Sequence, residues 1–143
     1  MRYFPLLFLL LFFIRCDFPQ DPNHSFEEAK QSGLKVGVAI NPPFTFLKNG
    51  NLKGSEIELI KNFAEKKNLD LDFTIATESE LIEQLEKHQL HVVVGGFDKK
   101  TIWNKKSGLS VPYDGKHVFL VGKGENKLLF ELENFLFETF KKQ

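Results

Sequence analysis

The stretch from Leu34 to Lys67 constrains the fold of this chain more than any other. It opens with an apolar run, Leu34 to Ile40, turns at Pro42 and Pro43, and ends in an amphipathic helix that we expect over 55–67. A Val/Ile-rich run followed by such a helix is typical of a strand buried on both faces of a parallel sheet. The turn between them then lies at the carboxyl end of the sheet, where open α/β folds bind their ligands.

Two helix starts are marked by a serine followed three residues later by a glutamate. Ser55 with Glu58, and Ser25 with Glu28, have the spacing of a capping box, in which the two side chains satisfy the first backbone N–H groups of a helix. We therefore expect a helix beginning at Ser55 and one or two helical turns over 26–31.

The rest of the chain continues the alternation of strands and helices. In order, we expect an extended piece 44–47, a tight turn at Asn49-Gly50, a strand 69–76, a helix 78–88, a strand 90–94 that stops at a glycine turn Gly95-Gly96, strands 109–112 and 117–121 around a turn at Asp114-Gly115, and a helix 126–140. This alternation requires right-handed crossovers and a parallel sheet. The predicted fold class is α/β, a three-layer open sheet that is mostly parallel, with helices on both faces. The expected strand order is 2-1-3 plus the C-terminal strands, with 69–76 half-buried at an edge.

Length, charge and composition narrow the functional classes. The chain has 143 residues and is 42% apolar, which is enough for one folded domain with its own core. Its formal net charge is zero, so nothing in the charge favours nucleic acid as a partner. Both arginines, Arg2 and Arg15, lie near the N-terminus, so a chain beginning at Cys16 contains none.

Residues 1–16 have the pattern of an export signal. The apolar run Phe4 to Ile14 is too short to span a bilayer of ~30 Å but fits the apolar region of a signal peptide. Cys16 resembles the lipidated cysteine of bacterial lipoproteins, although Arg15 stands where a small residue is usual; the alternative is an uncleaved signal anchor with an incidental thiol. Either way we expect the domain in the periplasm or on the cell surface, held to a membrane by its N-terminus. We expect residues 17–33 to form a polar tether and residues 34–143 a single lobe.

The sequence contains no recognisable catalytic or cofactor-binding set. His88 and His91 lie three residues apart, but no second pair completes a zinc site, and no phosphate-binding glycine loop is present. We therefore expect no enzyme activity, no metal and no cofactor. The helix 126–140 places Phe130 and Phe137 opposite its apolar face, either as surface scatter or as a contact with another chain or a membrane.

The order of motifs from Leu34 onward resembles the first lobe of the bacterial family-3 solute-binding proteins, the periplasmic receptors of amino-acid transporters. The segments that carry the resemblance are a strand followed by PPF and EIELI, then GGFDKKTIWNKKSGLSVPY from Gly95 to Tyr113, and a closing strand and helix from His117. The resemblance implies one lobe of a type-2 periplasmic binding protein that binds a small polar solute, and a transporter permease as partner.

Two departures from that family stand out. Family members carry a second lobe of around a hundred residues after the Pro-Tyr motif, whereas here only Asp114, Gly115 and Lys116 precede the closing segment. The arginine that grips the solute α-carboxylate in amino-acid receptors aligns with Trp103, and a threonine before it aligns with Lys100. A lysine supplies only a point charge in place of a bidentate arginine.

What remains is half of a binding site on the carboxyl edge of the sheet. Its expected residues supply an aromatic wall, backbone N–H groups, a stacking face and a positive charge: Pro43, Phe44, Phe46, Gly95, Gly96, Phe97, Trp103 and Lys99 or Lys100. For each there is a structural alternative, since the phenylalanines can be core residues, the glycines a simple turn, Trp103 a cap on the sheet edge, and the lysines solvated.

Two functions from different classes follow. The first is non-catalytic binding of a small solute by a membrane-anchored lobe. The second is a docking module that binds no solute and contacts a partner, such as a second copy, through Phe130 and Phe137; a truncated paralogue without a function of its own is a further possibility.

Overall fold

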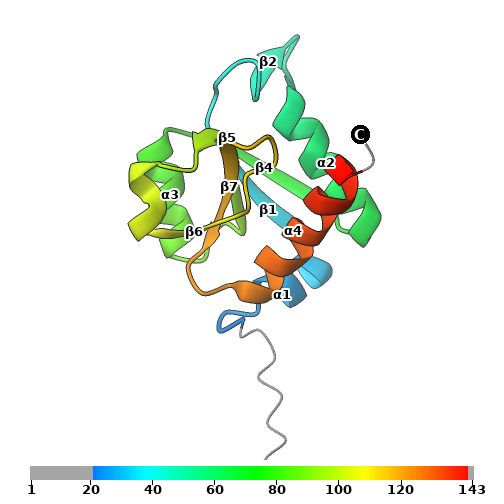
Figure 1. Ribbon diagram of the computed structural model, residues 1–143, viewed down its shortest axis with the longest axis vertical. Coiled ribbons are helices and arrows are strands. Elements are labelled where there is room, and N and C mark those ends of the chain that lie inside the picture. The colour runs from blue at the N-terminus through cyan, green and yellow to red at the C-terminus, as the bar shows by residue number, and fades with distance from the viewer. Residues whose placement is uncertain (1–20, 142–143) are drawn as a thin grey trace, which may run out of the picture.

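The computed structural model describes residues 21–141, and a five-stranded sheet lies at its centre (Figure 1). The elements are α1 (Ser25–Ser32), β1 (Leu34–Val38), β2 (Phe46–Lys48), β3 (Asn51–Lys53), α2 (Ser55–Lys67), β4 (Leu71–Ile75), α3 (Glu78–Glu86), β5 (Val92–Asp98), the 3-10 helix η2 (Ile102–Lys105), β6 (Ser107–Leu109), β7 (His117–Gly122) and α4 (Asn126–Lys141). The strand order is β4-β1-β5-β7-β6.

The predicted topology is confirmed. β1 pairs in parallel with both β4 and β5, which is the 2-1-3 order, and β4 is an edge strand. β7 runs antiparallel to β5 and to β6, so it is the one strand of this sheet that reverses direction. The sheet is therefore mixed but mostly parallel, and the loops after β1 and β5 emerge at its carboxyl edge.

Helices cover both faces, as expected. On one face α1, α2 and α4 pack against alternate residues of the strands, including Val36, Val94 and Phe119; on the other face α3 and η2 pack against Val93 and Leu120. Successive strand side chains point to opposite faces, so each central strand contributes to both clusters. Figure 1 shows these layers, with α3 on one side of the sheet and α2 and α4 on the other.

The β2–β3 hairpin projects from the carboxyl end of the sheet (Figure 1). Its turn is the predicted Asn49-Gly50, with φ of 52° and 76°. Positive φ at both central residues is the geometry that favours Asn-Gly in a two-residue hairpin.

Two strand boundaries differ from the prediction. β5 does not stop at Gly95-Gly96 but continues to Asp98, with its register to β7 shifted between Val93 and Phe97. Gly96, with φ of 67°, absorbs that irregularity inside the strand. The strand expected over 109–112 lies earlier, over 107–109, where it pairs with β7.

Neither predicted capping box forms. α2 begins after Gly54 and α1 after His24, and neither residue offers a side-chain cap. The structure instead shows a capping box at Thr77 and Glu80, at the start of α3.

The segment expected to be a tether contributes to the folded domain. α1 includes the predicted turns over 26–31, but its Phe26 and Ala29 are buried in the main core cluster. From Ser25 onward this segment is therefore part of the lobe. Residues 1–20, with the predicted signal and Cys16, lie outside the described part, and no helix within residues 21–141 is long and apolar enough to cross a membrane.

Candidate functional site

The candidate site is the carboxyl edge of the sheet, where the loop after β1 meets the irregular part of β5. Asn41 Nδ2 donates to the carbonyl oxygen of Gly95 (2.8 Å), which ties the two segments together. The Phe44 ring lies over Gly96: a Cβ at that glycine would come within 2.3 Å of Phe44 Cδ2. On its other side, Phe44 contacts the His117 ring, with centroids 4.4 Å apart.

Backbone carbonyls of the same loop cap the following helix. The Ser55 and Glu56 N–H groups donate to the carbonyl oxygens of Pro43 (3.3 Å) and Phe44 (3.1 Å). This close approach requires Gly54, because a Cβ there would come within 2.1 Å of the Phe44 oxygen. The first N–H groups of α2 are thus satisfied by the main chain, which explains why no capping box forms.

Hydrogen bonds to the Glu56 side chain hold this edge together. It is fully buried, and its Oε2 accepts from the N–H groups of Gly95 (2.8 Å) and Gly96 (3.0 Å). Its Oε1 accepts from the Tyr113 hydroxyl at 2.6 Å. Both glycine N–H groups are therefore already bound within the protein, which contradicts the expectation that they are offered to a solute.

Burial has the largest effect on the pKa values of Glu56 and its partner Tyr113. Desolvation raises the pKa of the Glu56 carboxyl, against the hydrogen bonds from Tyr113 and the two glycines, which lower it. Burial and the adjacent carboxylate also raise the pKa of Tyr113, so its hydroxyl stays protonated and remains a donor.

A tight turn closes the lobe beside this network. Asp114 Oδ1 accepts from the N–H groups of Lys116 (3.0 Å) and His117 (2.7 Å), and its Oδ2 lies 2.6 Å from His117 Nδ1. Although partial burial acts to raise it, these hydrogen bonds from His117 and Lys116 lower the pKa of Asp114 to about 2. This turn replaces a second lobe in the described chain.

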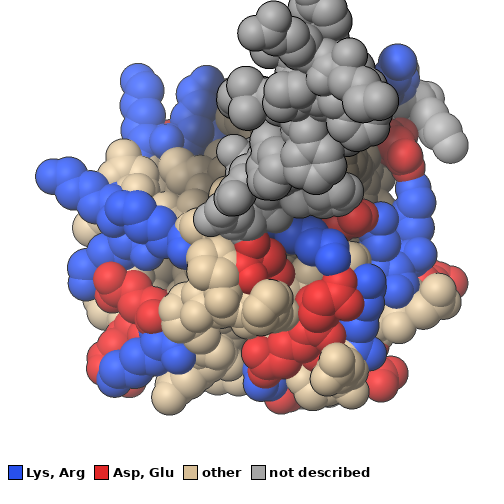
Figure 2. Space-filling view, turned by 90° about the horizontal axis from the view of Figure 1, so that it is seen from below, with Lys and Arg blue, Asp and Glu red and all other residues tan. Residues whose placement is uncertain are grey.

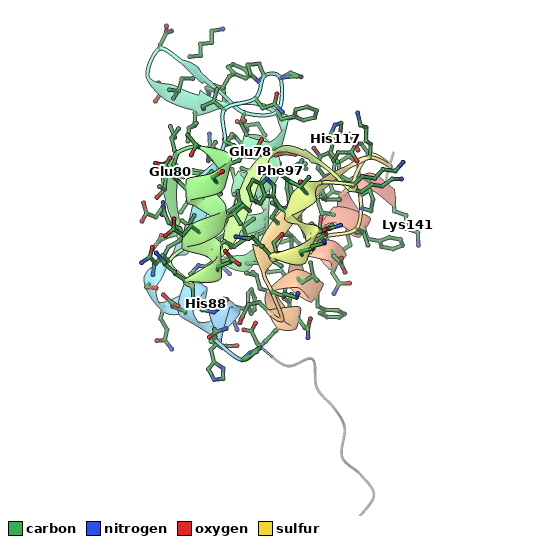
Figure 3. All side chains as sticks on the ribbon, turned by 90° about the vertical axis from the view of Figure 1, so that its left-hand side faces the viewer. Glu78, Glu80, His88, Phe97, His117 and Lys141 are labelled. Atoms are coloured by element: carbon green, nitrogen blue, oxygen red, sulfur yellow. The ribbon has the colours of Figure 1, made fainter. Side chains whose placement is uncertain are left out.

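Trp103 stands at the other side of the same edge. Its half-buried ring packs on the cluster beneath α3, and its Nε1 donates to Glu78 Oε2 at 2.9 Å. Figure 3 shows Glu78, Phe97 and His117 at the same end of the molecule, with His88 at the opposite end. The contact holds a carboxylate at this edge, a feature that the sequence did not suggest.

The other residues that the sequence placed in the site differ in their burial and position. Phe97 is 5% exposed and its side chain belongs to the core, while Phe46 is half-buried in the hairpin strand β2. Pro43 and Lys100 are exposed. The structure therefore brings Phe44, Gly95 and Gly96 together, and it leaves Trp103 and Lys100 on a neighbouring segment.

Sequence reasoning missed Glu56, Glu78 and the pair Tyr113 and His117. Only Glu56 gave a usable signal: it lies four residues before Ile60 on the buried face of α2, where a carboxylate needs partners. Within residues 21–141, no group of three or more histidine, cysteine, aspartate or glutamate side chains is placed to hold a metal ion.

Comparisons with known proteins agree with this fold. The family model of the bacterial extracellular solute-binding proteins, family 3, matches residues 34–143. This chain belongs to that family. The match covers one lobe, and the fold is that of the first lobe of these proteins.

Individual relatives support the same assignment. The probable ABC transporter arginine-binding protein ArtJ of Chlamydia trachomatis serovar D is 37% identical over 93 residues, which are 62% of this chain and 36% of that protein. The arginine-bound form of domain 1 from TmArgBP is 29% identical, with a TM-score of 0.67 over 73% of this chain and 91% of that one. The arginine-bound form of truncated ArgBP from T. maritima, at 18% identity, has a TM-score of 0.71 over 79% and 99% and shows the likeness of fold alone. The chain thus spans about a third of its curated relative and forms a single lobe.

Proposed function

We propose that this chain is an exported, membrane-anchored, non-catalytic lobe that binds an amino acid with a cationic side chain at the carboxyl edge of its sheet. A transporter permease is the proposed partner of the loaded lobe. The observation that carries the proposal is the pair of Trp103 and Glu78, an indole ring and a carboxylate held together at 2.9 Å on that edge.

The chemistry of this pair favours a positive charge on the solute. A cation is attracted both by the face of an indole ring and by a carboxylate. The exposed Lys100 lies three residues before Trp103 and can supply the charge for the solute carboxylate. No arginine is present in residues 16–143 to make a bidentate contact instead.

The relatives support the same solute class and remove an objection to a one-lobe site. A site on one lobe leaves much of its solute exposed, so we would expect it to bind weakly. However, domain 1 of TmArgBP is described in an arginine-bound form, which indicates that a single lobe of this family can hold a solute.

The test is calorimetric titration of the chain from Asp17 onward, which contains the whole described domain, with arginine, agmatine and citrulline. Agmatine lacks the carboxylate of arginine, and citrulline lacks its charge. We expect arginine to bind best, agmatine more weakly and citrulline hardly at all. Trp103→Ala should remove binding of all three.

A matched pair of lysine variants sharpens the result. Lys100→Ala should weaken the binding of arginine about tenfold while leaving that of agmatine unchanged, since a charge-assisted hydrogen bond to the carboxylate contributes roughly 1.5 kcal/mol. Lys48→Ala, an exposed lysine in the β2–β3 hairpin, should change neither. Equal affinity for arginine and citrulline would contradict the proposed solute class, and no binding of any of the three to the folded lobe would contradict the proposed site.

A second candidate, a docking module formed by two copies of this chain, has its own observation. Phe130 and Phe137 are 53% and 62% exposed on the outer side of α4, as the sequence predicted. Phe137 also lines an open apolar groove of about 440 Å³ with Val111 and Phe140. A dimeric mass in solution that Phe137→Asp converts to a monomer would favour this candidate; a monomeric wild type would exclude it.

A further inference from the structure

The point at which the chain enters the lobe is firmly held. Asn23 donates to Glu125 Oε1 from its backbone N–H (3.0 Å) and its Nδ2 (2.6 Å), and the Ser25 N–H donates to Oε2 (3.2 Å). Pro22 lies against Gly124, in the loop between β7 and α4. The N-terminal segment therefore leaves the lobe at a fixed place, beside Lys123.

Basic side chains gather next to that place. Lys105, Lys106, Lys123 and His88 line a hollow of about 240 Å³ with a single acidic residue, Glu86; we call this the basic hollow. Lys123 Nζ donates to the carbonyl oxygen of Lys105 (3.0 Å), which holds two of the lysines together. Figure 3 shows His88 at the end of the molecule where the blue helix α1 lies, far from Phe97 and His117.

The positive charge of the basic hollow is only partly compensated. Lys106 forms an ion pair with Glu86 at 3.3 Å, but within residues 21–141 no carboxylate forms an ion pair with Lys105 or Lys123. In contrast, the other lysines of this end have glutamate partners: Lys30, Lys35, Lys87 and Lys127. Figure 2, which views the molecule from this end, shows lysine side chains around the rim with acidic ones between them. Among the lysines of this end, the uncompensated charge is thus confined to the basic hollow.

The short chain between Cys16 and Asp21 limits how an anchored lobe can be oriented on the membrane. Five residue steps separate Cys16 from Asp21, which reach at most about 18 Å when fully extended. The seven residues of β5 alone span roughly 20 Å, and loops extend beyond both of its ends. A lobe anchored at Cys16 therefore cannot turn its carboxyl edge to the membrane, because the anchor point lies at the other end.

We propose that the basic hollow rests on an anionic lipid surface, so that the lobe stands on its N-terminal end with the carboxyl edge of its sheet facing away from the membrane. The inference rests on the membrane anchoring in the proposed function. Juxtamembrane lysines are attracted to anionic headgroups within about a Debye length, and the short tether keeps them in that range. A permease in the same membrane then has to reach past the lobe to meet its solute site.

The experiment places a fluorophore at either end of the lipidated full-length chain. Cys16 is the only natural cysteine and its thiol is consumed by the lipid, so Gln89→Cys beside the basic hollow and Asn49→Cys at the hairpin tip give single labels. Each protein is reconstituted into phosphatidylcholine vesicles with or without phosphatidylglycerol, and a headgroup nitroxide lipid quenches nearby labels. We expect quenching of the Gln89 label to exceed that of the Asn49 label at least about threefold with phosphatidylglycerol, and high salt to reduce the difference.

Two charge-reversed triples complete the test. Lys105→Glu with Lys106→Glu and Lys123→Glu should lower the quenching of the Gln89 label in anionic vesicles. The matched triple Lys48→Glu, Lys53→Glu and Lys61→Glu, at the opposite end, should leave it unchanged. If the two labels of vesicle-bound protein are quenched equally, or if the first triple does not change the quenching, the inference is wrong while the anchoring still stands. Protein that does not float with either kind of vesicle overturns the anchoring, and the inference with it.

Discussion

Glu56 and Glu125 each bind a distant segment of the chain by hydrogen bonds, Glu56 at the carboxyl edge of the sheet and Glu125 at the N-terminal end of the lobe. Their partners differ. Both are almost fully buried, and both accept backbone N–H groups from a distant segment: Gly95 and Gly96 for Glu56, and Asn23 and Ser25 for Glu125. The third partner of Glu56 is a tyrosine hydroxyl, whereas that of Glu125 is a second carboxyl group.

The difference sets how each end responds to its surroundings. A hydroxyl donor stays protonated at every physiological pH, so the carboxyl edge keeps its shape. A carboxyl partner donates only while it holds a proton, so the entry of the N-terminal segment depends on pH. The carboxyl edge is therefore expected to stay constant with pH, whereas the N-terminal end is expected to respond to it.

The largest expected effect comes from removing the acceptor at the carboxyl edge. Glu56→Ala leaves two glycine N–H groups and the Tyr113 hydroxyl without partners in a buried place, which we expect to cost roughly 3 kcal/mol of unfolding free energy. Urea denaturation should show a lower midpoint with an unchanged slope. Glu56→Gln, which keeps an acceptor oxygen, should lose less than half as much, and equal losses would refute the role of the oxygen.

Removing the Glu125 carboxylate should cost less unfolding free energy than removing that of Glu56, and its effect should stay local. In Glu125→Ala the Ser25 N–H is left without its partner in a buried place, but Asn23 is exposed and can bond to water, so we expect a loss of about 1 kcal/mol. Amide hydrogen exchange at those two residues should accelerate at least about tenfold, with Gly95 unchanged. Glu131→Ala, in the helix α4 that begins directly after Glu125, is the matched control; acceleration there as well would show that α4 as a whole has been weakened.

The smallest effect concerns the shared proton of Asp21 and Glu125. Burial and the bond to Glu125 raise the pKa of Asp21 to about 6, and its buried Oδ1 has no other partner within residues 21–141. Although burial acts to raise it, hydrogen bonds from Asp21, Asn23 and Ser25 lower the pKa of Glu125 to about 2. Between pH 4 and 6 the folded state therefore keeps a proton that the unfolded chain has lost, and stability falls as pH rises.

Asp21→Asn tests this, because an amide donates to Glu125 at every pH. We expect the variant and the wild type to have equal unfolding free energies near pH 4.5. The variant should become more stable by up to about 1 kcal/mol at pH 7, a value reduced by the partial exposure of the pair. Parallel curves over that range would exclude a shared proton.

Local patterns predicted much of the fold because they report local energetics. The Asn49-Gly50 turn is set by two positive φ angles, and the parallel pairing of β1 with β4 and β5 follows from the helices that connect these strands. The exposure of Phe130 and Phe137 followed from helical periodicity alone.

The features that sequence reasoning missed are created by tertiary contact. The first N–H groups of α2 are satisfied by carbonyls of Pro43 and Phe44, which only the folded loop delivers, so Ser55 has no capping role. Gly95 and Gly96 resembled a turn, but they lie inside β5, where the Phe44 ring packs against Gly96 and Glu56 accepts both N–H groups. The location of the candidate site stays a prediction, whereas two of its expected donors, the N–H groups of Gly95 and Gly96, are bound by Glu56.

The turn around Asp114 has a consequence for how the lobe folds. Resemblance to the two-lobe members of the family implies that their β5 and β7 are separated in sequence by a whole second lobe. In this chain Asp98 and His117 pair across a short connection. Closing a shorter loop costs less entropy, and lower contact order favours faster folding. The lobe can therefore complete its sheet as soon as β7 is synthesised, as an autonomous folding unit.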